Sequence, residues 1–229
     1  MRHVSLSRRA LLAAAAPALA CCVVWSLAGC DAGSPSDAAA DDAPSRDASA
    51  EATSEIDPDD PYATGIHHAT IEVEGYGTIE VSLNANVAPI TVSNFCHLAE
   101  EGFYDGLTFH RVVPGFMIQG GDPSGDGTGG SGQTITGEFS DNGVENDIPH
   151  VRGTISMARS SDYDSASSQF FIMQETTSSL DGQYAAFGTV TSGMEVVDAI
   201  CEQVTVADEA SGYVAPEDQP VITGVTIVD

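Results

Sequence analysis

The sequence predicts a mainly β domain in which short antiparallel strands form a barrel or a sandwich. About eight short segments show the alternation of apolar and polar residues that is typical of strands. Only two segments have helical spacing, and strands and helices do not alternate regularly as they do in parallel sheets.

The first two predicted strands cover residues 67–73 and 78–83, and the glycines around Tyr76 join them as a hairpin. A helix is expected to begin at Pro89, because the following apolar residues recur at helical spacing, and to end at Gly102. The remaining predicted elements are strands at 108–113, 116–119, 153–158, 169–173, 187–190 and 221–228, and a second amphipathic helix at 193–201. These elements place the folded domain at residues 66–229.

A basic stretch near the N-terminus precedes an almost wholly apolar run at residues 10–28. The run leads into Leu27-Ala28-Gly29-Cys30, which resembles a bacterial lipobox, where the cysteine thiol takes a diacylglycerol. We therefore expect residues 1–29 to be a lipoprotein-type signal peptide, and lipidated Cys30 to anchor the protein to the outside of the cell membrane. The alternative is a signal anchor, since the run is long enough to span a bilayer. Residues 7–12 also resemble a twin-arginine signal, so Sec and twin-arginine export both stay open.

Residues 30–65 consist mainly of Asp, Ala, Ser, Pro and Gly after the cysteine. Such a composition buries too little apolar surface to offset the entropy of ordering, so we expect a disordered acidic linker. An acidic recognition tail is the alternative.

The charge balance excludes two classes of partner. The chain holds 34 acidic residues, seven arginines and no lysine, and three of the arginines precede Cys30. Nucleic acid is not expected as a partner, because its binding needs cations to neutralise phosphate. Direct docking on anionic lipid head groups is not expected either, so the membrane contact is through the lipid anchor alone.

Only Cys96 and Cys201 lie in the predicted domain. Both occur in apolar helical patterns, where buried free thiols are common. An exported protein can also form a disulfide, so the sequence leaves the two states open.

The glycine-rich loop after residue 120 matches the first half of a calcium-binding EF-hand, but Gln133 stands where the bidentate glutamate belongs. It also lacks the Gly-Lys-Ser/Thr of a phosphate loop, and the histidines show no ligand spacing. No serine or cysteine carries a nucleophile-elbow motif. We therefore expect no metal and no cofactor.

Arg111 is the most informative residue, because a lone cation among apolar residues needs a partner or a task. On regular strands Phe109 would share a face with Arg111, and Gln169 with Phe171. These residues suggest a pocket for a small apolar group with a polar neighbour. Equally, the aromatic rings could form core while Arg111 pairs with a carboxylate, and the residues alone leave both readings open.

The stretch Phe109–Asp122, FHRVVPGFMIQGGD, resembles the signature of the cyclophilin-type peptidyl-prolyl isomerases. Further segments follow in the order of that family, namely GTGG at 127–130, GTISMA at 153–158, SQFFI at 168–172, LDG at 180–182 and FG at 187–188. The similarity covers about residues 67–228. It implies a closed eight-stranded antiparallel β-barrel capped by two α-helices, with peptide bound on the outer face.

The resemblance also implies roles for individual residues. Arg111 is expected to be the catalytic arginine, and the expected substrate-binding residues are Phe109, Phe116, Met117, Gln119, Gly127, Ala158, Arg159, Gln169, Phe171, Leu180 and Tyr184. Three positions depart from the best-known eukaryotic pattern: Arg159 stands for Asn, Ser179 for a Trp that contacts cyclosporin, and Tyr184 for a His. We therefore expect activity to persist and cyclosporin to inhibit weakly.

Together these features predict a monomeric peptidyl-prolyl cis-trans isomerase that acts on proline-containing unfolded or exported polypeptides as a membrane-tethered folding factor. The alternative is a non-catalytic peptide-binding or holdase module on the same scaffold. A pure binder could lose the catalytic arginine, so the presence of Arg111 with Gln119 and Phe171 favours the enzyme.

Overall fold

The computed structural model describes residues 52–229. The predicted signal peptide, the lipidation site Cys30 and most of the predicted linker lie outside this range. Within it, none of the helices has the length and apolar character needed to cross a bilayer.

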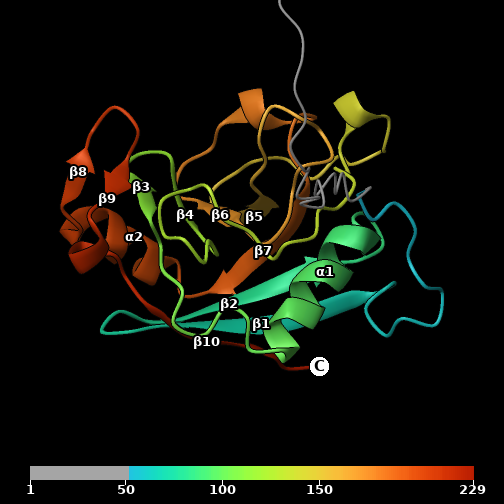
Figure 1. The fold of residues 1–229 in the computed structure, drawn as a ribbon, viewed down its shortest axis with the longest axis horizontal. Coiled ribbons are helices and arrows are strands. Elements are labelled where there is room, and N and C mark those ends of the chain that lie inside the picture. The colour runs from blue at the N-terminus through green and yellow to red at the C-terminus, as the bar shows by residue number, and fades with distance from the viewer. Residues whose placement is uncertain (1–51) are drawn as a thin grey trace, which may run out of the picture. The chain divides into compact units, whose positions relative to one another are not determined.

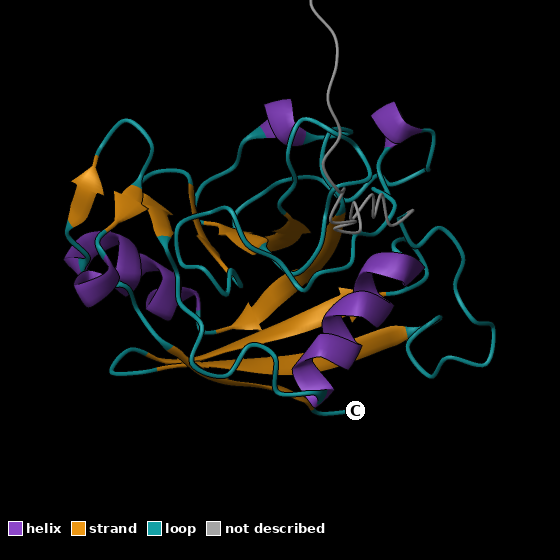
Figure 2. Cartoon of the chain, in the orientation of Figure 1, coloured by secondary structure: helices purple, strands orange, loops and turns teal. Residues whose placement is uncertain are grey.

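The described residues form one antiparallel sheet of ten strands (Figures 1 and 2). Its spatial order is β10-β1-β2-β7-β5-β6-β4-β3-β9-β8. The strands are β1 Ile66–Val73, β2 Gly77–Asn84, β3 Arg111–Val113, β4 Met117–Gly120, β5 Thr154–Met157, β6 Phe170–Met173, β7 Ala186–Ser192, β8 Val206–Asp208, β9 Tyr213–Val214 and β10 Ile222–Ile227.

Both predicted helices are present, as α1 Pro89–Glu100 and α2 Met194–Gln203. Proline at the first helical position needs no N–H donor there, and Gly102 leaves the helical path with a φ of 69°. α1 packs against β2 and β10, and α2 packs against β2, β3 and β4. Three single-turn 3₁₀ helices complete the fold, η1 Ser140–Asn142, η2 Ser178–Leu180 and η3 Pro216–Asp218.

The predicted eight strands all occur, but the strand number was wrong, because β8 and β9 add a short hairpin beside β3 (Figure 1). The prediction of a closed barrel is not confirmed, since the ladders end at β10 on one side and at β8 on the other. An irregular segment bridges the gap: Phe109 N–H donates to the Pro220 carbonyl at 2.9 Å, and Ile222 N–H to the Leu107 carbonyl at 2.7 Å. The sheet does not close here because β3 begins at Arg111 rather than at residue 108, as the sequence predicted.

The core lies between the sheet and the helices and is rich in aromatic rings. Phe95 of α1 packs on Tyr104, Phe170 and Phe187 with ring centroids 5.2 to 5.6 Å apart. Such tilted and edge-on contacts are the favourable geometries for aromatic pairs. The core therefore fixes α1 against the strands that carry the candidate site.

Residues 52–65, which we expected to be part of the linker, make contacts with the domain. Thr53 forms a parallel bridge with Ile135, and Tyr62 is 8% exposed and donates a hydrogen bond to Glu100 at 2.7 Å. The segment is acidic overall, so its composition did not indicate that a few of its apolar residues are buried against the domain. These contacts connect residues 52–65 to the domain.

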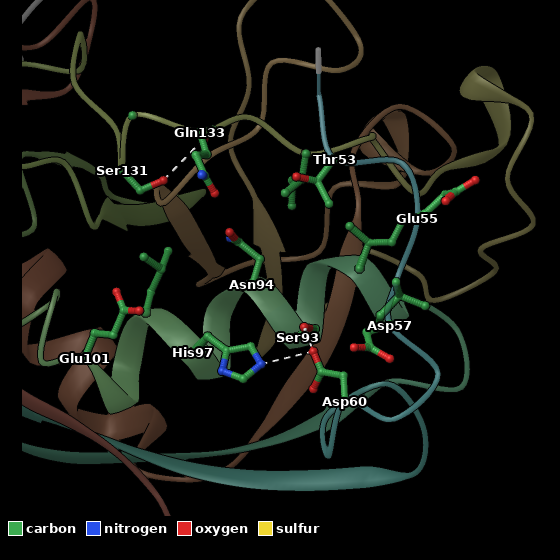
Figure 3. Close-up of a pocket in the computed structure, with 15 residues that line it drawn as sticks. Thr53, Glu55, Asp57, Asp60, Ser93, Asn94, His97, Glu101, Ser131 and Gln133 are labelled. Carbon is green, nitrogen blue, oxygen red and sulfur yellow. Dashed lines mark hydrogen bonds and ion pairs between the residues drawn. The ribbon is translucent and has the colours of Figure 1, made fainter. Parts of the chain in front are cut away.

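A pocket of about 530 Å³ lies between this segment, α1 and residues 131–135 (Figure 3). Its Asp60 carboxylate accepts hydrogen bonds from Ser93 Oγ at 2.5 Å and from the His97 ring at 3.0 Å (Figure 3 draws the contact with His97). These polar groups therefore hold residues 52–65 on the helix.

Cys96 and Cys201 are both free and buried, so the structure contains no disulfide between them. Burial raises the pKa of each thiol to about 12. Both cysteines therefore behave as small core residues rather than as reactive thiolates.

Candidate active site

A pocket of about 200 Å³ opens beside β3, β4 and β6, and we call it the apolar pocket after Phe116, Met117, Phe171 and Leu180 in its lining. It gathers nine of the residues predicted from the sequence: Arg111, Phe116, Met117, Gln119, Ala158, Arg159, Phe171, Leu180 and Tyr184. These residues come from separate strands and loops, so the fold is needed to bring them together.

Strand register explains how the polar and apolar halves of the pocket meet. Arg111 of β3 is paired with Gln119 of β4, and Gln119 is paired with Phe171 of β6. Directly paired residues project from the same face of a sheet. The guanidinium, the amide and the phenyl ring therefore form one row across three strands.

The Arg111 guanidinium is half-buried and held in place by two acceptors. Its Nε donates to the Ser211 carbonyl at 2.6 Å, and its Nη1 donates to Gln119 Oε1 at 3.1 Å. No carboxylate lies within ion-pair distance of it among residues 52–229. Burial lowers the pKa of the Arg111 guanidinium below its ordinary value, which is so high that the group remains a cation at neutral pH. The reading in which Arg111 pairs with a carboxylate is thus wrong for the described part of the chain.

A chain of amides continues from the arginine into the glycine-rich loop. Gln119 Nε2 donates to Gln169 Oε1 at 2.9 Å, and Gln169 Nε2 donates to the Gly129 carbonyl at 2.8 Å. Each donor fixes the next acceptor, so the loop and the guanidinium are oriented as a unit.

The apolar half of the pocket rests on Phe171. Its ring is 4% exposed and meets the Tyr184 ring edge-on, with centroids 5.8 Å apart. His150 stacks beneath it at 6.0 Å and is itself fixed by Asp181 and Ser156. Burial lowers the pKa of His150, which favours the neutral ring. This supporting role of His150 has no local signature in the sequence.

Arg159 lies at the pocket rim, and its guanidinium contacts the rings of Phe139, Tyr163 and Tyr184. Its guanidinium carbon is 4.7 Å from the Tyr184 ring centroid and 4.8 Å from that of Tyr163. Its Nε and Nη2 both donate to the Gln183 carbonyl, at 3.0 and 2.9 Å. These cation–π contacts and hydrogen bonds hold the rim where the pocket meets the adjoining groove.

The groove continues into a second hollow of about 210 Å³, which contains Gly127 and Gln169. Gln119, Ala158 and Arg159 line both hollows. The two remaining groove residues predicted from the sequence therefore lie beside the apolar pocket rather than inside it.

Phe109 is the one predicted site residue that the structure places elsewhere. Its ring is fully buried in the main core and packs edge-on against Phe170 at 6.0 Å. The expectation that Phe109 and Arg111 share a face assumed a regular strand, but β3 begins only at Arg111. The alternation of sides therefore does not extend back to Phe109.

An antiparallel sheet with an apolar pocket and a fixed cation at its edge defines a protein suited to bind a small ring joined to a polar backbone group. Comparison with known proteins identifies the class. The family model described as cyclophilin type peptidyl-prolyl cis-trans isomerase/CLD matches residues 68–228, and the chain belongs to this family of isomerases.

Curated relatives and solved structures agree with this family. A peptidyl-prolyl cis-trans isomerase of Synechococcus elongatus is 51% identical over 120 residues, which cover 52% of this chain and 77% of the relative. Peptidyl-prolyl cis-trans isomerase B of Bacillus subtilis is 50% identical over 125 residues, or 54% of this chain and 82% of the relative. A Cryptosporidium parvum cyclophilin type isomerase, crystallised in the presence of the dipeptide Ala-Pro, is similar with a TM-score of 0.61 and 29% identity. That match covers 71% of this chain and 99% of the solved one.

Proposed function

We propose that this isomerase uses Arg111 to accelerate rotation about X–Pro bonds in exported polypeptides, as a monomeric folding factor tethered to the membrane. The observation that carries the catalytic part is the Arg111 guanidinium, fixed through Nε and Nη1 and free of carboxylate partners in the described domain, at the edge of an apolar pocket. The relative crystallised with Ala-Pro supports a proline peptide as the occupant of such a groove.

The reaction needs neither a nucleophile nor a general base. Amide resonance raises the rotation barrier to about 18–20 kcal/mol, and twisting the bond localises the nitrogen lone pair. A hydrogen bond from the Arg111 guanidinium to the prolyl nitrogen is stronger in the twisted state than in the planar one, which is the condition for catalysis. The pocket around Phe171 holds the ring while the preceding carbonyl rotates.

A non-catalytic peptide-binding or holdase module remains the second candidate. A binder needs the apolar pocket and the amides of the groove, but it has no use for a guanidinium held at two atoms by Ser211 and Gln119. This double restraint favours the enzyme, because preorganised donors contribute most to transition states.

The membrane tether rests on the lipobox-like sequence before Cys30 and on the acidic stretch that follows it. We expect Cys30→Ala to move the protein from the membrane fraction to the soluble fraction and to abolish labelling by a fatty-acid probe. Cys201→Ala, which alters a buried cysteine of α2, is the control and should leave both unchanged. A wild-type protein that stays in the membrane fraction unlabelled would support a signal anchor instead.

Gly212 in the turn between β8 and β9 is expected to be essential for the position of Arg111. It has a φ of 80°, and a Cβ there would lie 2.4 Å from Val113 Cγ2 and 2.9 Å from the Val112 carbonyl. Gly212→Ala must therefore shift the turn and the adjacent Ser211 carbonyl that holds Nε. We expect about a tenfold loss of kcat in a proline-isomerisation assay, a loss of roughly 1.4 kcal/mol of transition-state stabilisation.

Gly143→Ala is the matched control, because Gly143 has a φ of 81° but open space at its Cβ position. Both substitutions carry the strain of a left-handed residue, whereas only Gly212→Ala disturbs Arg111. Equal kcat values for the two variants would refute a positioning role for the turn.

A further inference from the structure

A separate pocket of about 460 Å³ adjoins the apolar pocket at Arg111. It shares Arg111 and Gln119 with the apolar pocket, and beyond them it is lined by His110, Asp126, Gly127 and Asp208. The expected roles of the groove residues do not account for His110, Asp126 or Asp208.

The His110 ring is buried without hydrogen-bond partners in the described part of the chain. It is 2% exposed, and neither ring nitrogen has a partner among residues 52–229. Burial lowers the pKa of the His110 ring, so the neutral form with one acceptor nitrogen is favoured. Leaving a buried acceptor unpaired is unfavourable, and a donor that enters the pocket would relieve this cost.

Gly127 separates this ring from the groove. A Cβ built on Gly127 would lie 3.8 Å from His110 Nε2, in van der Waals contact with it. The absence of a side chain at this position, together with a φ of 89°, leaves the Nε2 edge without cover from residue 127.

Two carboxylates, those of Asp126 and Asp208, line the pocket, and both residues are exposed. Hydrogen bonds from Thr128 lower the pKa of Asp126, and hydrogen bonds from Ser211 and Ala210 lower the pKa of Asp208. Both groups are therefore anionic at neutral pH. The one cation in the lining, Arg111, donates to Gln119 and Ser211, which also line the pocket, and the two carboxylates outweigh its single charge.

We infer that this pocket is a client subsite that binds the side chain of a lysine or arginine near the isomerised proline. Two carboxylates and an imidazole acceptor complement a cationic group that carries several N–H donors. The shared Arg111 puts the subsite within a few residues of the proline, since an extended chain advances about 3.3–3.6 Å per residue. The inference rests on the proposed place of the prolyl bond at Arg111.

The test is a set of peptides around one Ala-Pro bond, with lysine, norleucine or glutamate placed in turn at each of the three positions on either side. The kcat/KM of the wild-type protein is measured at physiological salt to screen long-range attraction. We expect lysine to exceed glutamate by about fivefold at one or two adjacent positions, the scale of an ion pair near a protein surface. A uniform ratio at all positions would overturn the subsite.

The double variant Asp126→Asn and Asp208→Asn should bring the lysine-to-glutamate ratio at those positions close to one. The control changes the same number of charges at exposed residues away from the pocket, with Glu74→Gln and Glu195→Gln, and should keep the ratio. An equal ratio in both double variants would show that only the overall negative field acts, and would overturn the subsite. The proposed function is tested separately by the isomerisation rate of an all-alanine Ala-Pro peptide with the Arg111→Ala protein. The proposed function and the subsite can therefore be refuted independently of each other.

Discussion

Replacing Arg111 with alanine is expected to lower the isomerase turnover by about a hundredfold or more while the domain stays folded. Removing one preorganised donor to a transition state typically costs about 2.7–4 kcal/mol. The side chain is half-buried and makes no ion pair in the described domain, so its loss should disturb the packing little. A protease-coupled proline assay gives the rate, and circular dichroism reports the fold.

Arg152→Ala is the control for removal of an arginine. Arg152 donates to the Asp198 carboxylate on α2 and takes no part in the apolar pocket, so its loss should leave turnover near that of the wild type. Arg111→Lys keeps the charge but loses the planar fork of donors, and we expect an intermediate rate. Full activity of Arg111→Ala would remove the guanidinium from the mechanism.

The largest loss of stability is expected from Glu138→Ala. The Glu138 carboxylate is 2% exposed and caps α1 from a distant loop, since it accepts the Ile90 N–H at 3.0 Å and the Thr91 N–H at 2.8 Å. It also accepts the Thr91 hydroxyl at 2.6 Å, so alanine would leave three donors unpaired near the helix N-terminus. We expect a loss of about 3 kcal/mol in the free energy of unfolding, measured by urea titration.

Glu145→Ala serves as the comparison, because Glu145 lies just beyond η1 and is exposed. It should change the free energy of unfolding by less than about 0.5 kcal/mol. Glu138→Gln retains one acceptor and should fall between the two. If Glu138→Ala and Glu145→Ala unfold at the same urea concentration, the carboxylate does not cap α1.

Local patterns were enough to predict most of the sheet. The alternation of apolar and polar residues over 67–73 and 78–83 correctly predicted β1 and β2. When one face of a strand is buried, every second residue along it is apolar. Pro89 and Gly102 predicted the two ends of α1, because each residue restricts or frees the backbone locally, at its own position. The set of pocket residues came from family resemblance, since composition alone left a pocket and a core equally open.

Features that depend on distant partners could not be predicted. β8 and β9 contain three and two residues, too few to show a period, yet their turn supplies the Ser211 carbonyl to Arg111. Ala88 precedes α1 without a capping side chain, and nothing near it points to Glu138. The contacts of Tyr62 likewise reach α1 across 38 residues of sequence. Each case is a tertiary contact with no local sequence signature.

The most direct test of the mechanism measures binding and turnover of one Ala-Pro peptide on the same protein. NMR exchange spectroscopy yields both the dissociation constant and the rate of cis-trans exchange, for the wild type and for Arg111→Ala. If Arg111 acts mainly on the twisted state, the exchange rate falls by about a hundredfold while the dissociation constant changes only a few-fold. A loss of affinity with an unchanged exchange rate at saturating protein would contradict this, because the arginine would then bind the planar peptide as tightly as the twisted one.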